Sequence, residues 1–250
     1  MESGWALAFP LLALAGLMTL VAAAIRGLTG FGMAIILVPL LGLIVRPDEA
    51  VIIAILLQLF IAPVGISKIV RDADRASAGL IVGAAMIATP FGVWFLAQTA
   101  PDMARVIIAA IALIAFLLVL LPPRPHSKPG TVETLLTGLA AGALTGIAAM
   151  PGPPVVPYYL RQTITPERAR ASMLLVFFGT AIAATLSSYL LGLINPKILS
   201  LSILLFPTVL IGNWLGSMAF GRISERVWRS AVALILGLAG FSAVWRLIQS

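Results

Sequence analysis

Two related stretches decide the fold: LTGFGMAIILVP at residues 28–39 and LTGIAAMPGPPVVP at residues 144–157. Each places glycine or proline inside an apolar segment, where glycine permits unusual backbone angles and proline removes a backbone N–H. At membrane depth, the backbone groups freed in this way are tolerated only where protein or a water-filled cavity surrounds them. The pair therefore predicts two broken helices that face the interior of a membrane protein.

The surrounding sequence is apolar enough to lie in lipid. Of the 250 residues, 61% are hydrophobic and 10% are charged, and the mean hydropathy is +1.11. A soluble domain could not cover so much apolar surface. We therefore predict an all-α polytopic membrane protein. Its apolar segments are mostly long enough to cross a bilayer, but the seventh is too short to span alone. The ten segments are 5–25, 28–45, 50–67, 78–97, 103–121, 132–150, 154–160, 169–194, 198–220 and 227–248.

Further matches indicate that the chain is duplicated. RPDEA at 46–50 matches TPERA at 165–169, and PFGVWFL at 90–96 matches LIGNWLG at 210–216. Together with the match of 28–39 to 144–157, these give three matches in the same order, at offsets of 116, 119 and 120 residues. Three ordered matches at nearly one spacing are the signature of an internal repeat.

The linker PPRPHSKPG separates the two repeats, because its four prolines prevent a continuous helix. Each repeat is expected to hold about five helical segments, with the Gly/Pro-broken helices near the centre of the protein. The predicted division is a first membrane repeat at 1–121, a cytoplasmic linker at 122–130 and a second membrane repeat at 131–250.

Basic residues predict the orientation of the chain. Lys and Arg concentrate in four loops, whereas the loop at 98–102 has no basic residue and the loop at 195–197 has one. Because cytoplasmic loops are enriched in Lys and Arg, both termini are predicted to lie outside the cytoplasm. Corresponding loops of the two repeats carry opposite charge bias, which predicts inverted-topology repeats. The four basic loops are 68–75, 122–130, 161–170 and 222–229.

The motifs GLTGFGMAIILVPLL and GALTGIAAMPGPPVVPYYL resemble the paired Gly/Pro motifs of the TauE/SafE family of sulfite and organosulfonate exporters. The resemblance covers nearly the whole chain in two copies. It implies transport of a sulfur-containing anion such as sulfite, thiosulfate or an organosulfonate. Many members carry a denser glycine run in each copy than this chain does, so the resemblance does not specify the substrate.

The two breaks form the candidate substrate site. A helix N-terminus exposed at a break offers N–H groups and a positive dipole end to an anion, and proline early in a helix loses no useful donor. Alternatively, the small residues only allow close helix packing. Arg26 could mark the cytoplasmic end of the first span, and Gln58 and Asn213 could form interhelical hydrogen bonds. The candidate residues are Arg26, Thr29, Gly30, Gly32, Gln58, Thr145, Gly146, Met150, Gly152, Pro153 and Asn213.

Other residue types argue against other functions. The chain has no cysteine, its single histidine, His126, lies in the linker, and none of its nine carboxylates lies clearly within a span. We therefore predict no enzyme activity, no metal site and no cofactor, and we identify no residue for proton coupling. The net charge of +7 follows from the basic loops and does not indicate nucleic-acid binding. A homo-oligomer is possible but is not indicated.

The predicted function is transport of a small sulfur-containing anion across a cell membrane, the bacterial inner membrane, by a multi-pass carrier. The mechanism expected for two inverted repeats is alternating access, with export as the direction that the resemblance implies. A passive anion channel of the same fold and a carrier of a non-sulfur organic anion are the alternatives. The sequence leaves open which anion is carried, the coupling ion, and whether the first two segments of each half fully span or form a re-entrant hairpin.

Overall fold

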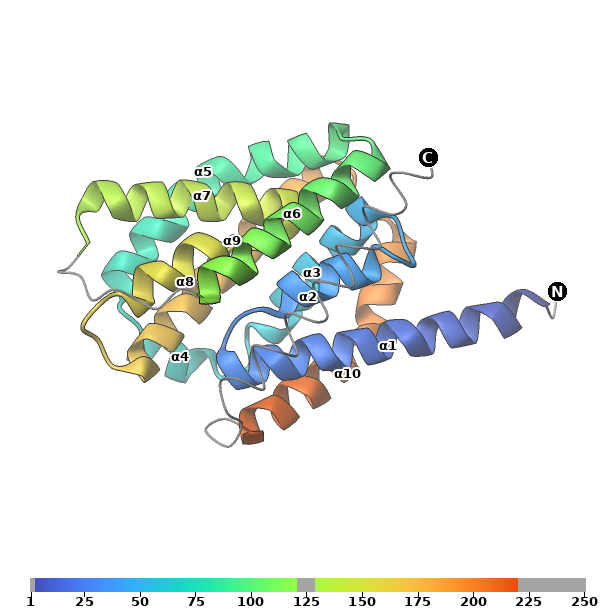
Figure 1. Ribbon diagram of the computed structural model, residues 1–250, viewed down its shortest axis with the longest axis horizontal. Helices are drawn as coiled ribbons and strands as arrows, with labels where there is room; N and C mark the ends of the chain where they lie inside the picture. The colour runs from blue at the N-terminus through green and yellow to red at the C-terminus, as the bar shows by residue number, and fades with distance from the viewer. Residues whose placement is uncertain (1–2, 121–128, 220–250) are drawn as a thin grey trace.

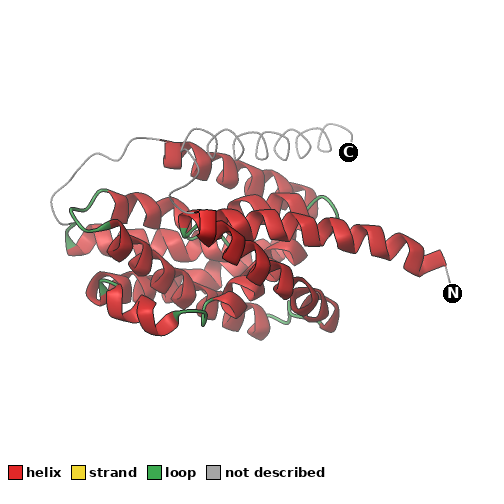
Figure 2. Cartoon of the chain, turned by 90° about the horizontal axis from the view of Figure 1, so that it is seen from below, coloured by secondary structure: helices red, strands yellow, loops and turns green. Residues whose placement is uncertain are grey.

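The computed structural model describes residues 3–120 and 129–219, and within these ranges the chain forms helices and loops with no strand (Figure 2). The expected segment 227–248, the basic loop 222–229 and most of the linker, including His126, lie outside the described residues. Figure 1 shows the helices in their order along the chain. They are α1 (Ser3–Thr29), α2 (Met33–Leu41), α3 (Pro47–Ile61), α4 (Ile66–Asp72), α5 (Arg75–Gln98), α6 (Pro101–Leu120), α7 (Thr131–Ala148), α8 (Gly152–Leu160), α9 (Pro166–Leu190) and α10 (Pro196–Ala219).

Several helices are long and apolar enough to cross a membrane. Among the described residues there are five: Pro10–Thr29 of α1, α5, α7, α9, and Pro196–Met218 of α10. The helices α3 and α4 pass the same test together, with a bend of 84° between them. The prediction of an all-α, multi-pass membrane protein is confirmed.

The expected segment 50–67 is not one helix. It is divided into α3 and α4 at the sequence APVG, where Pro63 cannot donate a backbone N–H and Gly65 has a φ of 77°. The left-handed region is readily accessible to glycine and is costly for other residues, so the direction of the chain changes at this point. The first half therefore has six helices instead of about five.

The second segment of each half is too short to span a bilayer. Both α2 and α8 have nine residues, which corresponds to about 14 Å of helix. A bilayer core is about 30 Å thick. α2 packs against the preceding helix α1, and α8 packs against α7. Each half thus begins with a long and a short helix that meet at a break.

The most extensive helix contacts join the two halves. α5 packs along α7, and α1 packs along α10 (Figure 1). Glycines allow both pairs to approach closely, because an added Cβ would collide with the backbone of the partner helix. In the first pair these are Gly92, Gly138, Gly142 and Gly146, and in the second pair they are Gly27, Gly212 and Gly216.

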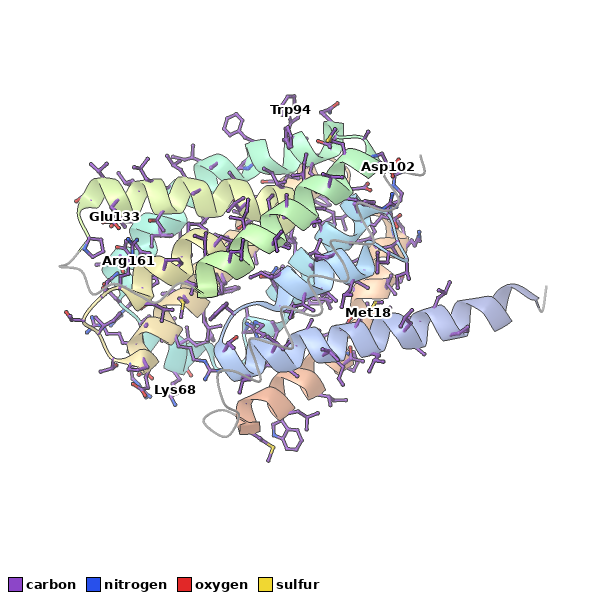
Figure 3. All side chains as sticks on the ribbon, viewed as in Figure 1. Met18, Lys68, Trp94, Asp102, Glu133 and Arg161 are labelled. Carbon is purple, nitrogen blue, oxygen red and sulfur yellow. The ribbon has the colours of Figure 1, made fainter. Side chains whose placement is uncertain are left out.

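The helix contacts occur in matched pairs. The sequence matches relate α1–α2 to α7–α8, α3 to α9, and α5 to α10. The contact of α1 with α10 then corresponds to that of α7 with α5, and the contact of α3 with α10 corresponds to that of α9 with α5. Trp94 and Trp214, which the alignment pairs, are 54% and 59% exposed. Figure 3 shows Trp94 on the outer surface. Two related halves are expected to contact each other through such matched pairs of helices. That the halves have opposite orientations in the membrane stays a prediction.

The helix α3 lies at the centre of the protein. Its residues from Ala50 to Leu57 are all buried, although they point to every side of the helix. A helix that is apolar all round and fully buried requires neighbours on every face. Here α2, α6, α9 and α10 surround it, and its C-terminal part reaches the breaks.

Candidate functional site

The first break, between α1 and α2, depends on two glycines. Gly30 and Gly32 have φ angles of 85° and 89°, in the left-handed region. The Thr29 side chain stabilises this turn, because its Oγ1 donates to the Ile25 carbonyl at 2.8 Å and accepts the Phe31 N–H at 3.2 Å. The Thr29 hydroxyl is therefore engaged by the backbone of its own break.

The second break, between α7 and α8, is made differently. Ala149 follows the last residue of α7 with a φ of 58° and is the one non-glycine residue with positive φ among the described residues. A left-handed residue is a common way to end a helix, but glycine is the usual choice. After Met150 and Pro151, α8 begins at Gly152. The break therefore resembles the first in position but not in residue type.

The two breaks meet at one pocket. The helices α3 and α9 supply one residue each, and the remaining wall comes from the breaks and the helix ends beside them. The cavity has a volume of about 20 Å³, which is room for about one water molecule. Its lining residues are Arg26, Phe31, Gly32, Met33, Ala34, Ile35, Gln58, Ala149, Met150, Pro151, Gly152 and Phe177.

Arg26 contributes the charge of the pocket. It comes from the last turn of α1, and its Nη1 donates to Oδ1 of Asn213 on α10 at 3.1 Å. Asn213 is well placed for this, because α1 and α10 touch at Gly27 and the Asn213 backbone. Within the described residues, no carboxylate forms an ion pair with Arg26. Its guanidinium is thus held in place by a neutral side chain.

Two ion-paired carboxylates of the described residues, Glu133 and Asp102, lie at opposite ends of the bundle (Figure 3). Glu133 and Arg161, 3.2 Å apart, lie at the same end as Lys68, and Asp102 lies at the opposite end (Figure 3). The pocket between these ends is therefore lined by Arg26 and neutral residues. This distribution of charge favours an anion in the pocket.

Gln58 links the central helix to the second break. Its Nε2 donates to the carbonyl oxygen of Ala149 at 3.1 Å and to that of Ala54 at 3.2 Å. The Ala149 carbonyl belongs to the left-handed residue that ends α7. Gln58 is thus both a pocket residue and an interhelical hydrogen bond, so the two interpretations of this residue are compatible.

The structure brings together some of the predicted site residues and separates others. Thr145 is buried, and its Oγ1 donates to the Ala141 carbonyl at 2.6 Å. Gly146 packs against the backbone of α5, and Pro153 lies in the first turn of α8 beside the pocket wall. Thr29 and Gly30 belong to the first break, and Asn213 supports Arg26. The predicted residues that line the pocket are Arg26, Gly32, Gln58, Met150 and Gly152.

Two residues of α9 in this region were not predicted. Phe177 lines the pocket, and the offset of 119 residues between RPDEA and TPERA pairs it with Gln58, so the repeat could have indicated it. Arg170 approaches the first break from α9, and its Nη2 donates to the Gly27 carbonyl at 2.9 Å. In the sequence it is one of several arginines in a basic loop, and no local pattern distinguishes it from Arg168.

Comparison with known proteins identifies relatives. The family model described as sulfite exporter TauE/SafE matches residues 14–243. A protein of Cupriavidus necator described as a probable sulfite/organosulfonate exporter TauE is 27% identical over 123 residues, which are 49% of this chain and 48% of that protein. The matched part of the chain thus spans about half the length of this curated relative. No solved structure matches the chain.

Proposed function

The chain belongs to the sulfite exporter TauE/SafE family, and on that premise we propose that it carries a small sulfur-containing anion across the membrane through the pocket between the two breaks. Sulfite, thiosulfate and organosulfonates are the candidate substrates, with export as the direction. The observation that carries this proposal is Arg26 in a pocket whose other lining residues are neutral.

The groups around the pocket suit an oxyanion. The first N–H groups of a helix have no partner within the helix, and the dipole makes that end positive. Met33 and Gly152, the first residues of α2 and α8, both line the pocket. The Arg26 guanidinium adds a planar pair of donors that matches two oxygens of a sulfonate or sulfite group.

The size of the cavity supports transport by alternating access. At about 20 Å³ it holds about one water molecule, whereas sulfite has four heavy atoms. A substrate therefore needs the helices around the breaks to move apart before it can bind. In our proposal the two halves rock against each other and open the pocket to one side of the membrane at a time.

The transport test uses purified protein in liposomes that contain unlabelled sulfite. External labelled sulfite should accumulate against its gradient by counterflow, with a rate that saturates as its concentration rises. Thiosulfate and isethionate serve as competing sulfur anions, and acetate serves as the non-sulfur control. Flux without saturation or counterflow would favour a passive channel, and flux of acetate alone would favour a carrier of non-sulfur anions.

We also propose that the halves are inverted and that both termini lie outside the cytoplasm. Ser67 and Gln98 are exposed at either side of α5, and the chain has no native cysteine. Single cysteines at these two positions should react with an impermeant maleimide from opposite sides of the membrane. Ser67→Cys should react only in inverted vesicles, and Gln98→Cys should react in intact cells. Reaction of both from one side would contradict this topology.

A further inference from the structure

Two side chains cover carbonyl groups at the ends of the broken helices. At the first break, Nη2 of Arg170 on α9 donates to the Gly27 carbonyl of α1 at 2.9 Å. At the second break, Nε2 of Gln58 on α3 donates to the Ala149 carbonyl at 3.1 Å. The helices α3 and α9 are equivalent in the two repeats. Each half thus supplies a donor to the break of the other half.

Carbonyl groups at a helix end are important for the charge of the substrate. The last carbonyls of a helix have no partner within it, and the dipole makes that end negative. A broken membrane helix places this negative end beside the positive end of the next helix. Bare carbonyls in such breaks bind cations, whereas the N–H groups of the other end bind anions. The preference of a break therefore depends on which end is covered.

Arg170 covers the negative end of α1 in two ways. In addition to its bond to Gly27, its side-chain stem lies against Gly30, where an added Cβ would be 2.8 Å from the Arg170 Cγ. The Gly27 carbonyl that it binds belongs to the residue directly after Arg26. Arg170 therefore brings a second positive charge to the break from a different helix.

The two contacts do not come from equivalent positions. The offset of 119 residues pairs Arg170 with Val51 and Gln58 with Phe177, and neither partner has a side chain that can donate a hydrogen bond. The same arrangement, a donor on a helix-end carbonyl, is thus reached by different residues in the two halves. Duplication alone does not account for this.

We propose that Arg170 and Gln58 determine the charge selectivity of the transporter. By occupying the Gly27 and Ala149 carbonyls, they leave N–H and guanidinium donors to face the substrate, so the pocket accepts anions and rejects cations. This inference rests on the proposed function and specifies how the same pocket selects its substrate class. Arg170 acts through the break and is a positioning residue, whereas Gln58 lines the pocket itself.

The test measures sulfite affinity by calorimetry on detergent-purified protein, with Arg170→Met and Gln58→Met as the variants. Each should weaken sulfite binding by about tenfold or more, because each exposes a carbonyl that repels the anion. Sodium ions should stabilise both variants against heating, and they should not stabilise the wild type in this way. Arg170→Lys, which keeps the charge and a donor, should recover part of the affinity.

Matched controls separate this role from packing and from net charge. Arg168→Met removes the same charge two positions away, where the side chain is exposed and lies 4.0 Å from Asp74. Gln162→Met removes a side-chain bond to the Tyr158 carbonyl, and Gln162 does not line the pocket. Both controls should bind sulfite within about twofold of the wild type, because neither residue lines the pocket.

The outcomes distinguish the inference from the proposed function. A wild type that binds none of sulfite, thiosulfate and isethionate would overturn the proposed function, and the inference with it. Wild-type binding that neither Arg170→Met nor Gln58→Met weakens would overturn only the inference, as would equal losses in the controls. If Arg170→Met does not accumulate, Arg170→Gln replaces it. That variant keeps a donor without the charge, and unchanged sulfite affinity in it would refute the part assigned to the Arg170 charge.

Discussion

Two charged side chains, Arg26 and Arg170, reach the first break, between α1 and α2. The second break, between α7 and α8, is reached by the neutral side chain of Gln58 and lies beside close backbone contacts with α5. The residue that the repeat pairs with Arg26 is Gly142, which packs directly on Ala85 of α5. The residue paired with Asn213 is Val93, which is fully buried. The two halves thus share the position of the break, but they differ in what surrounds it. A similar backbone feature at two places in the chain does not require similar chemistry around it.

The two short helices also differ in the donors that they offer. The first turn of α2, Met33–Ile36, has an N–H at every residue, whereas that of α8 contains Pro153 and Pro154, which have none. The prolines make the start of α8 rigid but reduce the number of N–H groups that can face an anion. We infer that the substrate lies closer to the first break, with the second break acting as the opposite wall.

The largest effect is expected from Gly146→Leu, which tests whether the second break is held by packing. A side chain at this position would collide with the backbone of α5 at Thr89 and Val93. Overpacking of a core typically destabilises a protein by about 1–3 kcal/mol. The loss of stability should be larger here, because the clash is with backbone atoms, which cannot rotate away as a side chain can. The variant should therefore be nearly absent from purified, folded protein in size-exclusion chromatography. Gly83→Leu on the open side of α5 is the control, and equal yields for both would contradict close packing at this site.

A loss of transport without a loss of folded protein is expected for Gly152→Leu. The nearest atom to an added Cβ is the Cγ2 of Val156 at 3.8 Å, so a larger side chain can extend into the cavity and fill it. Gly152→Ala is the control, because it changes the same residue before Pro153 but adds only a methyl group. It should keep most of the sulfite counterflow. Normal sulfite counterflow by Gly152→Leu would remove the second break from the substrate pathway.

Changes at Arg26 test whether the first break holds the anion. Removing a charged hydrogen-bond partner typically costs about 1.5–3 kcal/mol, or roughly ten- to a hundredfold in affinity. We expect Arg26→Ala to weaken sulfite binding by this amount. Arg26→Lys should also weaken it, because it loses the planar fork of donors. Unchanged calorimetric affinity in both variants would leave the helix N-termini as the binding groups and remove the main difference between the breaks.

The smallest effect is expected from Ala149→Gly, which tests the strain at the second break. A left-handed conformation costs a non-glycine residue roughly 1–2 kcal/mol, and Ala149 has a φ of 58°. The glycine variant should therefore be more stable by about 1 kcal/mol, which thermal unfolding in detergent can detect. The matched change Ala148→Gly, one residue earlier and within α7, should instead destabilise the protein by about that amount. Equal effects of the two changes would show that Ala149 is not strained.

Much of the fold follows from local properties of the sequence. The apolar segments identified most of the long helices, and the positions of glycine and proline identified both breaks. The division of the segment 50–67 at Pro63 and Gly65 was missed, because hydropathy continues through it while the backbone does not. Whether α2 and α8 span the bilayer also could not be read from hydropathy, since a buried half-helix is as apolar as a lipid-facing one.

The candidate site was only partly predictable. Arg26, Gly32, Met150 and Gly152 lie at the breaks themselves, so a motif could indicate them. Thr145 and Gly146 belong to the same motif, but neither lines the pocket. The Thr145 hydroxyl bonds to the backbone of α7, and Gly146 packs against α5. A helix turns by about 100° per residue, so neighbours in a motif point to different surroundings. The direction in which each residue points depends on the orientation of the whole helix.

By itself, the sequence determined that this is a helical membrane protein with a helix break at each of two Gly/Pro motifs, and it predicted that the two halves are related. These properties depend on composition and on the chemistry of glycine and proline, which act over a few residues. Only the tertiary structure decided which side chains reach the breaks. The bonds of Gln58 to Ala149, Arg170 to Gly27 and Arg26 to Asn213 join residues 91, 143 and 187 positions apart. Contacts over such separations form only after whole helices have packed, so no local pattern in the sequence encodes them.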